Sequence, residues 1–246
     1  MISHLVLAFA LLMSMHIALH RTPEENNTGS LPTAAQIFAA SEDAMGTTAD
    51  RAAIHSISAI AACHGPKGNY ETRLISDRNG NLSFQQFLAD HNNIAGIIDG
   101  QGWHLNEKGN YEPIDEVEKF ILRSHEFPML ALDLRNRFHD FHAVTLSEFE
   151  NQPTITIAMT DELGHAVTAH FSQASRLPVA IISENPRTNG PRTVTTRFDA
   201  WKRVANVNLV SHVTILFGSE VYTFNFTNLQ VNVTDKAAFA PPGKSK

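Results

Sequence analysis

Histidines beside acidic residues are the side chains of this sequence best suited to acid–base or metal chemistry. His125 and Glu126 are adjacent in LRSHEF, and the stretch HDFH places His139 and His142 three residues apart around Asp140. On a helix, both imidazoles of HDFH would lie on one face, where they could ligate a metal ion. A metal-dependent hydrolase built from these residues is therefore one hypothesis, and ordinary polar surface is the other.

None of the common catalytic motifs accompanies these residues. A zinc-protease helix needs a second histidine four residues after His125, but Met129 stands there and Pro128 interrupts any helix. The stretch GQGWHL lacks the third glycine of a dinucleotide fingerprint, and no serine lies in a nucleophile elbow. We therefore expect a protein that is not an enzyme and that has no cofactor. The formal net charge of −6, with no long basic run, also argues against nucleic acid as the main partner.

A compact charged group ends an apolar helical pattern in the middle of the chain. Arg123, His125 and Glu126 stand there beside strongly apolar neighbours, just before Pro128. Such a group can be a structural cluster at the edge of a core or the rim of a ligand site. Cys63, the one cysteine, closes an apolar run and is expected to be a small buried hydrophobe.

The N-terminal residues have the pattern of a targeting segment. Residues 5–19 are almost wholly apolar and are followed by polar residues, which resembles a secretory signal peptide. The run is short for a membrane span, which needs about 20 apolar residues. We expect residues 1–20 to be a signal peptide or an N-terminal anchor, residues 21–32 a polar linker, and residues 33–246 a single domain.

Alternating apolar and polar residues dominate the rest of the chain and predict about ten strands. Helices are expected at 33–46, with Thr33 as the cap, and at about 114–138, where Pro128 should separate two helices. The apolar positions change parity near Asn228, which predicts a bulge where the sheet bends. The fold class expected is α+β, with one strongly curved antiparallel sheet and helices packed on its concave face.

Several stretches, taken in their order along the chain, resemble the LolA-like superfamily of periplasmic lipoprotein carriers. They are the signal-like start, a helix ending in AMG, a hairpin with IIDGQGWHLN, and FDAWKRV before the strands that end at FAPP. The superfamily includes outer-membrane lipoprotein-sorting proteins and RseB-type lipid-sensing regulators. The segment VANVNLV after FDAW departs from the family pattern, which often has a glycine and a proline there. The family positions matched here are Trp103, Phe198, Trp201, Phe239 and Pro241.

The resemblance implies a half-barrel whose helices act as a lid over a cavity that holds acyl chains. The implied function is non-enzymatic carriage or sorting of a lipid or an acylated protein in the periplasm, with transient membrane contact. A regulatory or structural interaction protein that docks an envelope protein is the alternative. The residues expected to line the cavity are Trp103, Phe120, Leu130, Leu134, Phe198, Trp201 and Phe224. The residues expected at its rim are Arg123, His125 and Glu126.

Overall fold

The computed structural model describes residues 30–186, 193–233 and 236–241. The predicted signal peptide or anchor at 1–20 lies outside these residues, as does most of the predicted linker at 21–32. Among the helices that the structure describes, none is long and apolar enough to cross a bilayer.

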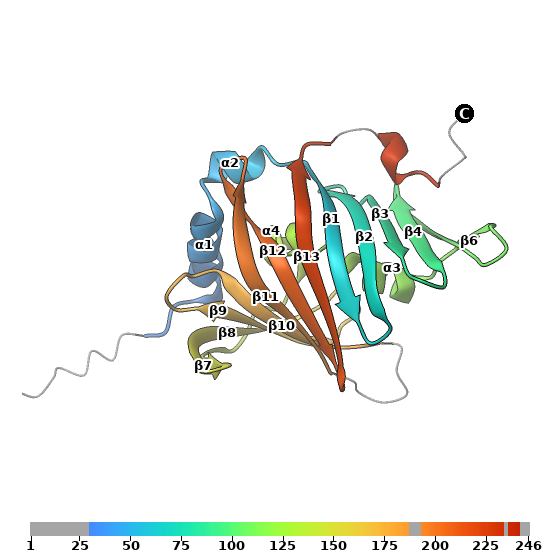
Figure 1. The fold of residues 1–246 in the computed structure, drawn as a ribbon. Coiled ribbons are helices and arrows are strands. Elements are labelled where there is room, and N and C mark those ends of the chain that lie inside the picture. The colour runs from blue at the N-terminus through green and yellow to red at the C-terminus, as the bar shows by residue number, and fades with distance from the viewer. Residues whose placement is uncertain (1–29, 187–192, 234–235, 242–246) are drawn as a thin grey trace, which may run out of the picture. The chain divides into compact units, whose positions relative to one another are not determined.

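Antiparallel pairing joins the strands of the described residues into one sheet of thirteen strands, in the order β6-β5-β4-β3-β2-β1-β13-β12-β11-β10-β9-β8-β7. The sheet curves into a half-barrel (Figure 1). Its strands are β1 (Ser56–Gly65), β2 (Gly68–Asp77), β3 (Leu82–Phe87), β4 (Asn92–Ile98), β5 (Gln101–Leu105), β6 (Tyr111–Pro113), β7 (Val144–Phe149), β8 (Gln152–Thr160), β9 (Ala166–Ser172), β10 (Pro178–Glu184), β11 (Thr193–Val204), β12 (Val207–Phe217) and β13 (Glu220–Val231).

The predicted fold class, α+β with one strongly curved antiparallel sheet, is confirmed. The predicted bulge is also present. Ile60 of β1 pairs with Asn228, but the next residue, Ala61, pairs with Phe226, so Thr227 is the extra residue of β13. The sequence did not predict β6, β7 and β10 as strands, and the sheet is wider than expected for that reason.

Two short helices precede the strands of the described residues, three more lie between β6 and β7, and a 3₁₀ turn follows β13. The capping box predicted around Thr33 is present: Gln36 N donates to Thr33 Oγ1 at 3.3 Å, and Thr33 N donates to Gln36 Oε1 at 2.8 Å. Pro128 lies in the first turn of α4, where its missing N–H is not needed. The helices are α1 (Ala34–Met45), α2 (Thr48–Ala52), α3 (Glu116–Arg123), α4 (Phe127–Leu132), α5 (Leu134–Arg137) and the 3₁₀ turn η1 (Lys236–Phe239).

The stretch HDFH is not helical, which corrects the geometry on which the metal hypothesis depended. The backbone of His139 forms two hydrogen bonds with Thr160, each 2.9 Å long, so the chain is extended there. Asp140 then has a φ of 51°, which turns the chain away from any regular helix.

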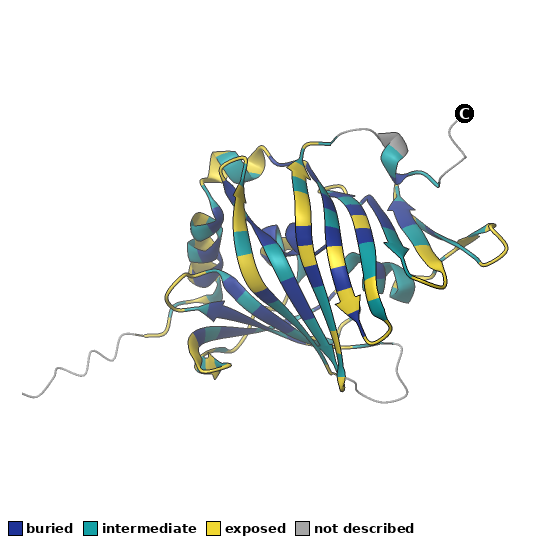
Figure 2. Cartoon of the chain, in the orientation of Figure 1, coloured by how far each residue is buried: buried dark blue, intermediate teal, exposed yellow. Residues whose placement is uncertain are grey.

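The two faces of the sheet differ in burial. Along β13, Phe224 and Phe226 are buried while Asn225 and Thr227 are exposed. Figure 2 shows this alternation as stripes along the central strands. Helices α3 and α4 lie behind these strands, on the concave face (Figure 1). The buried core therefore sits between the concave face and the helices, and polar side chains cover much of the convex face.

Candidate ligand-binding site

A cavity of about 890 Å³ opens between the concave face and the helices. Its walls come from α3, α4 and the end of α5 on one side, and from inward positions of β2, β10, β11, β12 and β13 on the other. Residues that directly follow β1, β3 and β10 also border it. Its volume lies in the upper part of the range of roughly 300–1,000 Å³ that holds small-molecule ligands.

Apolar and aromatic side chains line much of this space. Several of them, among them Ile215, Phe217 and Tyr222, point inward from the sheet and are still only half-buried. In a filled core such side chains would be fully buried, so their remaining exposure marks open space beside them. The apolar lining includes Tyr70, Phe120, Ile121, Phe127, Leu130, Val167, Ile181, Val194, Ile215, Phe217, Tyr222 and Phe224.

A row of rings crosses the site from β2 and β13 to the helices and on to β3. Phe224 stands 6.2 Å from Tyr70 and 5.0 Å from Phe127, measured between ring centroids. The imidazole of His125 continues the row, 5.6 Å from Phe127 and 5.5 Å from Phe84. Tilted and edge-on contacts of this kind hold each ring in one orientation. The row therefore forms a defined wall in which His125 is the imidazole among phenyl and phenol rings.

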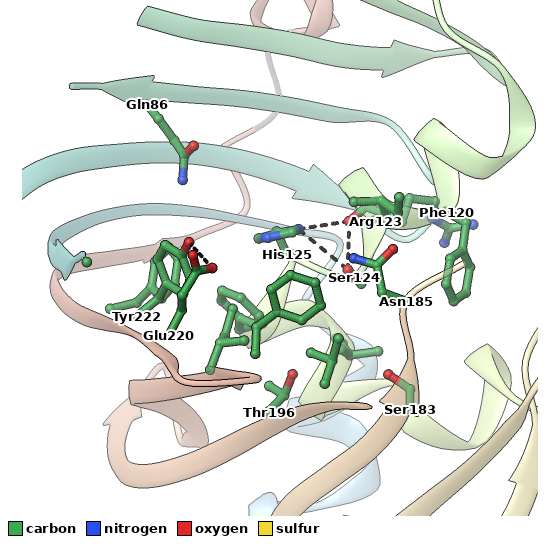
Figure 3. Close-up of a pocket in the computed structure, with 18 of the residues that line it drawn as sticks. Gln86, Phe120, Arg123, Ser124, His125, Ser183, Asn185, Thr196, Glu220 and Tyr222 are labelled. Atoms are coloured by element: carbon green, nitrogen blue, oxygen red, sulfur yellow. Dashed lines mark hydrogen bonds between the residues drawn. The ribbon is translucent and has the colours of Figure 1, made fainter. Parts of the chain in front are cut away.

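His125 projects from the turn between α3 and α4 into the cavity (Figure 3). Its Nδ1 lies 2.8 Å from the carbonyl oxygen of Ile121. Ser124 Oγ donates to the same oxygen at 2.6 Å. Burial lowers the pKa of His125 below its ordinary value, and the contact with the Ile121 carbonyl acts against this shift. The neutral imidazole is favoured for that reason.

Glu126 lies beneath this turn and is fully buried. Its Oε1 is 3.3 Å from Arg123 Nε, and its Oε2 is 3.1 Å from Arg137 Nη2. Burial raises the pKa of the Glu126 carboxyl to about 8, and the Arg123 guanidinium opposes part of that change. The three side chains tie the end of α3, the start of α4 and the end of α5 together.

Charged side chains lie where the strands around the cavity turn. Lys67 belongs to the turn after β1, and Asp90 and His91 belong to the turn after β3. Near the turn between β12 and β13, Tyr222 Oη donates to Glu220 Oε2 at 3.0 Å. The cavity thus combines a polar edge at the strand ends with an apolar interior beneath the helices.

The structure brings half of the predicted site residues together at this cavity. Phe120, Leu130 and Phe224 line it, and so do Arg123 and His125. Whether these side chains bind a ligand is still a prediction. The predicted residues that lie outside the lining are Trp103, Leu134, Phe198, Trp201 and Glu126.

Packing explains why the two tryptophans lie elsewhere. Trp103 fills the space above Gly96, where an added Cβ would meet its Cζ2 at 2.5 Å, and it stacks edge-on with Tyr111. Trp201 packs beside Phe198, 6.2 Å away, in the closed part of the core. Leu134 is the first residue of α5 and is buried in the core, and Glu126 is held beneath the cavity by its arginines.

Most of the lining was not among the predicted residues, for example Tyr70, Ile215, Phe217 and Tyr222. Tyr222 shares its strand face with Phe224, and this parity was a usable signal. Ile215 pairs with Tyr222 across strands and follows the same alternation in β12.

The residues of the metal hypothesis do not converge. Among the residues that the structure describes, no three His, Cys, Asp or Glu side chains are grouped as ligands for a metal ion. His139 Nδ1 instead contacts Asp140 Oδ2 at 2.8 Å, close to the surface. Cys63 is buried as expected, and burial raises the pKa of its thiol to about 11.

No protein-family model matches the chain, and no curated protein matches it. Solved structures do. A LolA superfamily protein from Nitrosomonas europaea aligns over 86% of this chain and 99% of its own, with a TM-score of 0.61 and 10% sequence identity. The chain has the LolA-like fold.

Two further structures share the LolA-like fold of this chain. A DUF1329 family protein from Desulfovibrio piger has a TM-score of 0.60 and 10% identity, and the alignment covers 85% of this chain and 98% of that one. A domain assigned to the outer-membrane lipoprotein-sorting proteins, from Vibrio parahaemolyticus, has a TM-score of 0.54 and 11% identity. The alignment covers 84% of this chain and 94% of that domain. The resemblance predicted from sequence order is therefore confirmed at the level of the fold.

Proposed function

We propose that this protein is a non-enzymatic carrier in the bacterial envelope that holds the acyl chains of a lipid or an acylated protein in its cavity. The observation that carries the proposal is the cavity of about 890 Å³ lined by half-buried apolar side chains on the concave face. Each methylene moved from water into such a space contributes about 0.8 kcal/mol. A chain of a dozen carbons is therefore retained without a catalytic group or a charged contact.

The helices act as the lid in this proposal. α3, α4 and α5 are short, they follow one another directly, and Phe120 and Leu130 face the cavity from α3 and α4. Their junction is held by the buried Glu126 with Arg123 and Arg137. The three helices can therefore shift as one body when a ligand enters.

The structural comparisons support this assignment through the names of the neighbours. One neighbour is a LolA superfamily protein and another is assigned to lipoprotein sorting. At 10–11% identity they share the fold with this chain, and the nature of the cargo is inferred from the cavity. A periplasmic location agrees with the signal peptide predicted at residues 1–20.

Mass spectrometry of the purified protein tests the proposal, first under native conditions and then after organic extraction. We expect a bound lipid at near-stoichiometric level, or uptake of an added long-chain lipid by the ligand-free protein. A folded protein that carries no lipid and takes up none would contradict the carrier function. Stable capture of an envelope protein by such a lipid-free protein would favour the alternative, an interaction protein on the same fold.

A further inference from the structure

The imidazole of His125 has one nitrogen engaged by the protein and one directed into the cavity (Figure 3). We propose that Nε2 of His125 selects the ligand, favouring acyl compounds that carry a neutral hydrogen-bond donor, a hydroxyl or an amide N–H, over compounds of the same shape without one. This inference rests on the proposed function of the cavity and specifies its ligand class.

The hydrogen bonds around Ile121 determine which nitrogen is available. A carbonyl oxygen only accepts, so Nδ1 of His125 carries the proton that is donated to Ile121 O at 2.8 Å. Ser124 Oγ donates to the same oxygen at 2.6 Å. In the neutral ring, Nε2 then has a free lone pair and no proton. It can accept a hydrogen bond and cannot donate one.

The aromatic rings beside His125 fix the orientation of its imidazole. The ring stands 5.5 Å from Phe84 and 5.6 Å from Phe127, which restrict its rotation and provide no hydrogen bond. A wholly apolar ligand in the cavity would displace water from Nε2 and leave a polar atom unsatisfied, which is costly. A ligand that carries a hydrogen-bond donor within reach of Nε2 replaces that water directly.

The carboxylates of Asp90, Glu162, Glu184 and Glu220 also accept hydrogen bonds, but they lie in turns or at strand ends. The hydroxyls of Ser183 and Thr196 and the amide of Gln86 can each donate or accept, so they tolerate either type of ligand. Burial lowers the pKa of His125, which favours the neutral ring. A carboxylate placed at this point would therefore gain neither a proton donor nor a positive charge from the ring.

Displacement of a fluorescent lipid probe by tetradecanol and by its methyl ether tests the inference. The two compounds have nearly the same apolar chain, and only the alcohol donates. The wild-type protein should bind the alcohol about 2- to 12-fold more tightly, the range that one neutral hydrogen bond provides. His125→Phe should bind both compounds equally. Ser124→Ala removes the other bond to Ile121 O and should keep the preference for the alcohol.

A second measurement needs no variant and covers the case in which His125→Phe does not fold. In nitrogen-15 spectra of the wild type, the Nε2 resonance of His125 should move toward its protonated position with tetradecanol and stay in place with the ether. Equal affinities, or a preference that survives in His125→Phe, overturn the inference and leave the carrier function standing. A bound probe that neither compound displaces also overturns the inference, whereas a folded protein that does not bind the lipid probe at all contradicts the carrier function and this inference together.

Discussion

Arg137 Nη2 lies 3.1 Å from Glu126 Oε2, within the junction that joins α3, α4 and α5. The carboxylate is fully buried, and the arginine side chain retains 11% of its exposure. Arg123 approaches the other carboxylate oxygen at 3.3 Å. Because Glu126 is buried with Arg123 and Arg137 beside it, moving the helices that cover the cavity apart would leave this buried group without its partners.

Removing Arg137 from its pair with Glu126 should destabilise the folded protein. Arg137→Met should lower the free energy of unfolding by about 3–5 kcal/mol, since it leaves the buried Glu126 with Arg123 alone. Urea unfolding of Arg137→Met, Glu126→Gln and the double variant measures the coupling between the two residues. The loss of unfolding free energy in the double variant should be clearly smaller than the sum of the losses in the two single variants. Losses that add within about 0.5 kcal/mol would show that the pair is not coupled.

Stability should fall in acid partly through His125. Burial lowers the pKa of this histidine in the folded protein. The unfolded chain therefore takes up a proton at about pH 6.5, before the folded protein does. The contribution to stability is complete above that pH and is lost as the pH falls toward the lowered pKa of the folded state.

Urea unfolding at several pH values below about 6.5 checks this linkage. His125→Phe should show a shallower loss of stability with acid than the wild type. Burial also lowers the pKa of His170, but His170 is present in both proteins, so the difference between them reports His125. Identical slopes for wild type and variant would refute the assignment.

Trp103 should matter for folding and not for binding. It is 6% exposed, packs over Gly96 and lies outside the cavity lining. Trp103→Ala should cost about 3–5 kcal/mol of stability, as expected for a large buried ring. Lipid binding measured well below the unfolding midpoint should be unchanged. A loss of affinity in a fully folded variant would place Trp103 in the binding site after all.

Much of the fold followed from alternation, because a strand with one buried face repeats every two residues. The parity change near Asn228 located a bulge, and Thr33 with Gln36 marked the start of α1. The three strands that were not predicted have weak or mixed patterns. β6 is short and ends at Pro113, β7 exposes Leu146 on the sheet edge, and β10 opens at Pro178 as a nearly continuous apolar run.

The site was less accessible to sequence analysis than the fold. Parity places Phe198, Phe224 and Trp103 among the inward side chains, yet only Phe224 borders the cavity. Which inward positions face open space depends on where the short helices cross the sheet. That crossing is set by tertiary contacts, such as the buried Glu126 between its arginines, which no local pattern encodes.

Filling the cavity from one strand position, with a control on the opposite face, determines whether the ligand occupies this space. Ile215 of β12 faces the cavity, whereas Val221 of β13 is 46% exposed and points the other way. Affinity for tetradecanol should fall more than about tenfold in Ile215→Trp, since the indole displaces at least two methylenes. Val221→Trp should bind like the wild type. Equal binding by a folded Ile215→Trp would contradict the account, because the ligand would then not occupy this cavity.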